Sequence, residues 1–100
     1  MPLYACALSV DLHLADSGSL KDKRAVVRHL LDTARRRFGV AAAEVDHQDR
    51  RQRALLGFAA VGSSHQHVEA VLDRVDRFVW SHPEVTVLST ARSWTDDVDG

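Results

Sequence analysis

The stretch that decides the fold is Leu3-Tyr4-Ala5-Cys6-Ala7-Leu8-Ser9-Val10-Asp11-Leu12-His13-Leu14. Large apolar residues alternate here with small or polar ones, a pattern typical of a β-strand with one buried face. The face predicted to be buried carries Tyr4, Cys6, Leu8, Val10, Leu12 and Leu14. The opposite face carries Ala5, Ala7, Ser9, Asp11 and His13, and we expect it to lie open.

Two later segments have helical periodicity. Residues 20–38 place apolar side chains at helical spacing between Ser19, a suitable N-cap, and Gly39, a suitable terminating residue. A second helix is expected after the turn Gly62-Ser63-Ser64 and before Pro83. Its predicted apolar stripe is Val68, Val71, Leu72, Val75, Phe78 and Val79.

Three further segments are predicted to be strands: residues 40–46, residues 53–61, and a strand from Val85 to about Trp94. The order βαββαβ contains two split βαβ units, whose crossovers are right-handed. It predicts an α+β ferredoxin-like sandwich: a four-stranded antiparallel sheet of order 4-1-3-2 with two helices on one face. With 100 residues, 45% of them hydrophobic, the chain suits one domain. We assign residues 1–94 to it and residues 95–100 to an acidic C-terminal tail.

Composition excludes several classes of protein. No apolar run approaches a membrane span, and no basic leader follows Met1, so we expect a cytoplasmic protein without membrane contact. The single cysteine, Cys6, excludes an internal disulfide, and His65 and His67 have no third ligand at a suitable spacing. We find no glycine-rich phosphate loop, carboxylate pair or nucleophile–base pair. The sequence therefore predicts no enzyme, no metal and no cofactor.

Positive charge is concentrated in one segment. Residues 21–53 hold ten basic and five acidic side chains, a net charge of +5 in a chain whose formal net charge is −1. In the predicted topology the start of the first helix and the hairpin between the second and third strands lie at the same end of the sheet. We therefore predict an RNA or phosphate-binding edge made of Lys21, Lys23, Arg24, Arg28, His47, Arg50, Arg51 and Arg53.

Two other interpretations remain open. The same basic residues could form a solvated rim with helical ion pairs such as Arg28–Asp32. The small residues on the open face of the first strand would also suit packing against a second copy of the chain or another partner. For His47, acid–base chemistry with Asp46 and Asp49 stands beside a role in shaping the turn.

Two motifs resemble those of the bacterial YlxP-like family, a small domain of unknown function. They are Ser19-Leu20-Lys21-Asp22-Lys23-Arg24, and Glu44-Val45-Asp46-His47-Gln48-Asp49 followed by Gln52-Arg53-Ala54. The likeness covers about residues 3–94. It implies a ferredoxin-like fold and a cytoplasmic location. Because genes of this family commonly lie beside those of translation initiation and ribosome maturation factors, it also implies a connection with the ribosome or RNA.

One position departs from the family pattern. The family hairpin usually continues Asp-Leu-Trp-Gln, whereas this chain has Asp49-Arg50-Arg51-Gln52. Two arginines thus replace an apolar pair and increase the local positive charge. From these observations we expect a non-enzymatic accessory factor that associates with RNA or a ribosomal subunit, with a homodimeric or partner-docking domain as the alternative.

Overall fold

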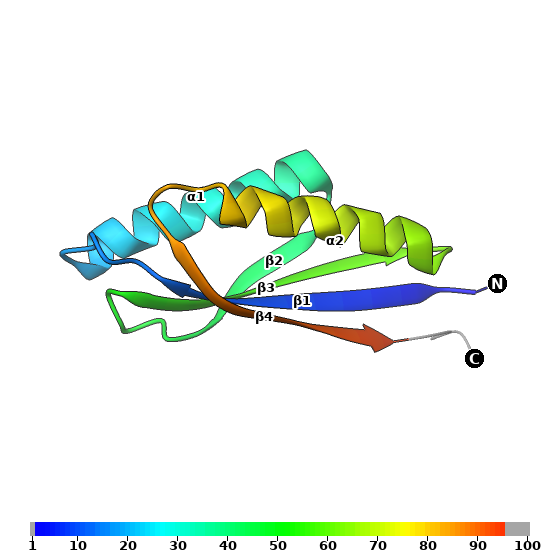
Figure 1. Ribbon diagram of the computed structural model, residues 1–100, viewed down its shortest axis with the longest axis horizontal. Coiled ribbons are helices and arrows are strands. Elements are labelled where there is room, and N and C mark those ends of the chain that lie inside the picture. The colour runs from blue at the N-terminus through cyan, green and yellow to red at the C-terminus, as the bar shows by residue number, and fades with distance from the viewer. Residues whose placement is uncertain (1, 96–100) are drawn as a thin grey trace.

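The computed structural model describes residues 2–95, which form a four-stranded antiparallel sheet with two helices on one face (Figure 1). The elements are β1 (Tyr4–His13), α1 (Leu20–Phe38), β2 (Ala41–Asp46), β3 (Arg53–Gly62), α2 (His65–Trp80) and β4 (Thr86–Thr95). The strand order is β2-β3-β1-β4, which confirms the predicted ferredoxin-like α+β fold. The central strand β1 pairs along its whole length with β3 and along most of it with β4.

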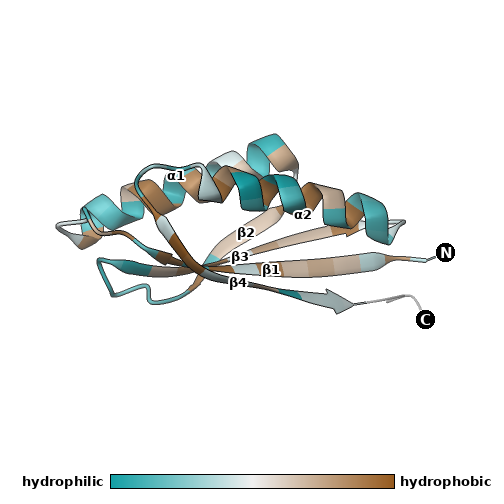
Figure 2. Ribbon diagram, in the orientation of Figure 1, coloured by the Kyte–Doolittle hydropathy of each residue, from teal (hydrophilic) through white to brown (hydrophobic). Residues whose placement is uncertain are grey.

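The core lies between the sheet and the helices, and the predicted register of β1 is confirmed. Cys6, Leu8, Val10, Leu12 and Leu14 are all at most 2% exposed. Alternate residues of β3 and the inner stripes of both helices complete the core. Figure 2 shows the contrast between this apolar interior and the hydrophilic β2–β3 turn and first turn of α1.

The helices begin and end where local chemistry predicts. The Ser19 hydroxyl accepts a hydrogen bond from the Asp22 N–H at 3.1 Å, and the Ser64 hydroxyl accepts one from the His67 N–H at 3.1 Å. Gly39 ends α1 in the left-handed conformation, with φ of 67°, which a residue without a Cβ adopts at little cost. Neither helix of the described residues has the length and apolar character needed to cross a membrane.

Strand ends differ from the prediction by about one residue. β2 begins at Ala41, β3 continues to Gly62, and β4 runs from Thr86 to Thr95 because it pairs with β1 as far as Ala5. Thr95, predicted to open the acidic tail, is therefore the last residue of β4. Residues 96–100 of that predicted tail lie outside the described residues.

Candidate nucleic-acid interface

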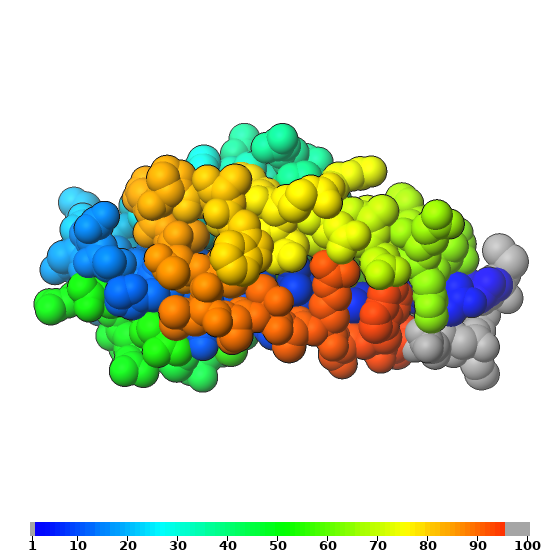
Figure 3. Space-filling view, viewed as in Figure 1, coloured from blue at the N-terminus to red at the C-terminus, as the bar shows by residue number. Residues whose placement is uncertain are grey.

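The β2–β3 hairpin packs against the start of α1 and the β1–α1 turn, so segments distant in sequence share one end of the molecule (Figures 1 and 3). The Leu14 N–H donates to the Gln52 carbonyl at 3.0 Å, and the Gln52 side-chain amide donates to the Ala15 carbonyl at 3.2 Å. These bonds hold the end of the hairpin beside the turn that precedes α1.

Lys23 joins α1 to the hairpin from inside the protein. Its side chain is 0% exposed, and its Nζ donates to the His47 carbonyl at 2.5 Å and lies 2.7 Å from Glu44 Oε2. That carboxylate oxygen is buried and has no hydrogen-bond partner among the described residues, so its interaction with Lys23 is an ion pair. An ammonium held in this way cannot reach a phosphate outside the protein. We therefore remove Lys23 from the predicted phosphate-binding residues.

His47 shapes the turn at the end of β2. Its φ of 65° is unusual for a residue with a side chain, and its N–H donates to Asp46 Oδ1 at 2.7 Å. Its carbonyl accepts from the Arg50 N–H at 3.0 Å as well as from Lys23. The described contacts thus give the backbone of His47 the turn-shaping role, which was one of the two left open by the sequence.

Arg53 already has a partner on the open face of the sheet. Its guanidinium contacts both carboxylate oxygens of Asp11, with NH2 at 3.1 Å from Oδ1 and 2.9 Å from Oδ2. Asp11 pairs with Leu55 and Arg53 pairs with His13, so the two side chains are diagonal neighbours, two register positions apart, on the same face of the β1–β3 pair. This bidentate ion pair offsets the charge of Arg53. Arg53 therefore lies at the predicted edge but contributes little to its positive electrostatic potential.

Five of the predicted residues remain exposed and without an ion pair among residues 2–95. They are Lys21, Arg24 and Arg28 of α1, and Arg50 and Arg51 of the hairpin. The predicted Arg28–Asp32 pair is absent from these contacts, because Asp32 pairs with Arg35 at 2.9 Å.

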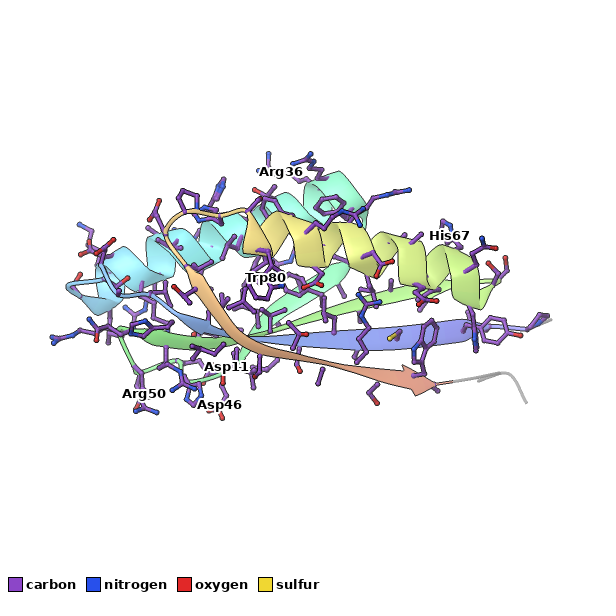
Figure 4. The ribbon with its side chains drawn as sticks, in the orientation of Figure 1. Asp11, Arg36, Asp46, Arg50, His67 and Trp80 are labelled. Carbon is purple, nitrogen blue, oxygen red and sulfur yellow. The ribbon has the colours of Figure 1, made fainter. Side chains whose placement is uncertain are left out.

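The hairpin tip borders a surface hollow of about 430 Å³. Its lining is His13, Arg50, Arg51, Gln52 and Arg53. Asp46 lies on the same side of the sheet as Arg50 (Figure 4), and its side chain is 65% exposed. This side of the hairpin thus carries an exposed carboxylate as well as the guanidinium groups.

The basic residues of segment 21–53 do not form one surface. α1 has 19 residues and spans about 28 Å, so Arg35, Arg36 and Arg37 in its last turn lie far from the hairpin. Figure 4 shows Arg36 above the helices and Arg50 below the sheet. Arg37 instead lines a second hollow with Arg74 and Arg77, a grouping that the sequence analysis missed. Its only signal in the sequence was the closely spaced arginines near the ends of both helices.

The remaining candidates for chemistry are the cysteine and the possible metal ligands. Cys6 is 2% exposed, and burial raises the pKa of its thiol, which disfavours the reactive thiolate. Within residues 2–95, no three His, Cys, Asp or Glu side chains are grouped so that they could hold a metal ion.

Comparison with known proteins agrees with the resemblance found in the two motifs. The chain is similar to the uncharacterized protein YlxP of Bacillus subtilis (strain 168), with 42% identity over 79 residues that cover 79% of this chain and 86% of that protein. Residues 6–92 match the model of a family described as a protein of unknown function, DUF503. The match includes α1, the hairpin and most of the sheet. The chain belongs to the DUF503 family.

Proposed function

We propose that this protein is a non-enzymatic, cytoplasmic accessory factor that binds RNA, in ribosome maturation or translation, through the tip of the β2–β3 hairpin. The observation that carries the proposal is the exposed pair Arg50 and Arg51 beside a 430 Å³ hollow. A guanidinium group presents several N–H donors in a fixed plane and binds phosphate oxygens in a bidentate manner.

The rigid support of these two arginines favours this function. The buried ammonium of Lys23 and the Gln52 side-chain bond fix the hairpin on both sides. A surface loop held in this way loses little conformational entropy when it binds a ligand, so more of the interaction energy remains as affinity. Lys21, Arg24 and Arg28 are also exposed, and they lie in the first half of α1, which begins at the same end of the molecule.

Contacts of this kind position an RNA without reading its sequence. Phosphates carry no base information, and the hollow holds only His13 and Gln52 as further polar side chains that could contact a sugar or base. We therefore expect binding that is broad in sequence and strongly dependent on salt, since each neutralised phosphate releases counterions.

The test is RNA binding across a salt series by the variant Arg50→Gln/Arg51→Gln beside the wild type. Loss of two phosphate contacts should reduce affinity and flatten the slope of log affinity against log salt by about 1.4 on a single strand. Arg36→Glu is the matched control: it changes the net charge by the same amount, far from the hairpin, and should leave the slope unchanged. Equal affinity and slope in all three proteins would exclude the hairpin as the binding site.

A ribosomal target has a separate test. Wild-type protein in a cell extract should migrate with a ribosomal subunit in a sucrose gradient at low salt and leave it at high salt. The hairpin variant should remain near the top of the gradient at both salt concentrations. Migration of wild type and variant alike would assign ribosome association to another surface.

The open face of the sheet supports a second candidate function, homodimer formation. Ala7, Gly57, Ala59 and Ala91 leave this face flat, and Val45, whose residue surface is 53% exposed, stands between two shallow hollows of about 290 and 280 Å³. A protruding residue beside a hollow of small residues is self-complementary under a twofold axis. Light scattering over a concentration series should then give the mass of a dimer.

A further inference from the structure

A second group of arginines lies between the two helices, away from the hairpin. Arg37, in the last turn of α1, approaches Arg74 and Arg77 of α2, and all three residues are exposed. They border an open hollow of about 390 Å³, a volume within the range of small-ligand sites. The rest of its lining is Phe38, Phe78 and Ser81.

No ion pair is formed by these three arginines among the described residues, whereas Arg35 pairs with Asp32 at 2.9 Å and Arg92 pairs with Asp73 at 2.8 Å. Three like charges around one hollow repel one another, and an anion that enters it removes this repulsion. The planar donors of guanidinium groups fit the oxygens of a phosphate better than those of a small spherical anion.

Aromatic rings lie beside the cations. The Phe38 and Phe78 ring centroids are 5.8 Å apart with an interplanar angle of 56°, and the Arg37 Cζ lies 5.3 Å from the centroid of Phe38. Both phenylalanines are only partly buried, so ring surface remains accessible. A ligand that carries a planar ring next to its phosphate would contact both the guanidinium groups and this aromatic surface.

We propose that this hollow binds a nucleoside phosphate, with the phosphate held by Arg37, Arg74 and Arg77 and the base packed against Phe38 and Phe78. The proposal is independent of the hairpin interface, because it uses other residues on another side of the molecule. The nucleoside phosphate has two sources, a free mononucleotide or one nucleotide of an RNA strand. Both present the same chemical group to the hollow.

The test is to titrate the wild-type protein separately with AMP, adenosine and inorganic phosphate and to monitor binding by amide chemical shifts. AMP should bind saturably and more tightly than either adenosine or phosphate, with the shifts centred on the six lining residues. Arg74→Gln/Arg77→Gln should lower the affinity for AMP at least tenfold, because two charged hydrogen-bond donors are lost. Phe78→Leu should lower the affinity for AMP and leave the affinity for inorganic phosphate unchanged.

Two controls separate this site from other effects of charge. Arg36→Glu changes the net charge as much as the double variant does but lies outside the hollow, and Arg50→Gln/Arg51→Gln alters only the hairpin. Both should bind AMP as the wild type does. Competition between AMP and a short single-stranded oligonucleotide would identify RNA as a source, and binding of AMP without competition would identify the free nucleotide.

Three results would overturn the proposal. One is the absence of saturable AMP binding, and another is equal loss of affinity in Arg36→Glu and Arg74→Gln/Arg77→Gln. The third is binding of an acidic peptide at these residues where AMP does not bind. If AMP does not bind and the arginine variants only lower the melting temperature, the arginines act only by stabilising the partial negative charge at the helix C-termini.

Discussion

Lys23, in the first of the two motifs, contacts two residues of the second motif. A fully buried ammonium loses its hydration, and this cost is offset only if charged and polar partners replace the lost water. Here the partners are the Glu44 carboxylate and the His47 carbonyl, both from the β2 side of the hairpin. Their positions in the two motifs therefore follow from how the hairpin is attached to α1.

Replacement of Lys23 should be strongly destabilising. Lys23→Met leaves the partly buried Glu44 carboxylate without its cation, so we expect the free energy of unfolding to fall by roughly 3–5 kcal/mol. Lys21→Met, on the exposed side of the same helix turn, should change it by less than about 0.5 kcal/mol. Urea denaturation of both variants measures the difference. Adding Glu44→Leu to Lys23→Met should restore part of the lost stability, and no restoration would show that the pair is not the source of the loss.

Cys6 gives a prediction about pH. Burial raises the pKa of its thiol from the ordinary value of 9.0, so the folded protein keeps a proton that the unfolded chain loses. The unfolded state then binds fewer protons above about pH 9, and stability falls as the pH rises past that value, by at most about 1.4 kcal/mol per pH unit. Below pH 8 the wild type and Cys6→Ala should have parallel stability–pH curves, and above pH 9 only the wild type should show this loss. Parallel curves up to pH 10.5 would contradict a raised pKa.

At the scale of the element, β1 carries the strongest constraint. Its alternate side chains lie either in the core or on the open face, and a shift of one residue would exchange the two sets. The pairing of Leu8 with Phe58 and of Ala7 with Ala59 shows the separation: the first pair is buried and the second is exposed.

This separation predicts unequal effects of two neighbouring substitutions. Leu8→Ala removes a side chain that is 1% exposed and should lower the free energy of unfolding by about 2–5 kcal/mol, through lost burial and the cavity that remains. Ala7→Ser, on the open face, should change it by less than about 0.5 kcal/mol. Thermal and urea denaturation provide the comparison. Similar losses in the two variants would be incompatible with the register.

At the scale of the whole molecule, the chain is an elongated body of 48 × 21 × 21 Å with different chemistry on its two faces. The helix face carries the second arginine group, and the open sheet face carries few charges between the Asp11–Arg53 pair and its far end. A long, weakly charged face beside partly exposed apolar residues is the surface on which self-association would bury the most area.

If two copies pack through this face, Ala7→Arg should prevent their association without unfolding the monomer. Ala7 lies on the central strand and lines both shallow hollows, so a charged side chain there would be buried in the interface without a partner. Light scattering should give a dimer for the wild type and a folded monomer for the variant, with circular dichroism as the check on folding. A wild type that stays monomeric at millimolar concentration would exclude the dimer.

The sequence by itself determined the fold and the ends of most elements, because these depend on local signals: the alternation in β1, the caps Ser19 and Ser64, the stop at Gly39, and the order of the elements. It also placed the hairpin and the start of α1 at one end. Only the tertiary structure decided which charges are available. Lys23 pairs with Glu44 and Arg53 pairs with Asp11, whereas Arg50 and Arg51 form no ion pair among the described residues. Arg37 differs from its neighbours in the sequence because it lines a hollow with Arg74 and Arg77. Such partners lie far apart in the sequence, and the free energy of a charged side chain depends on what surrounds it in space.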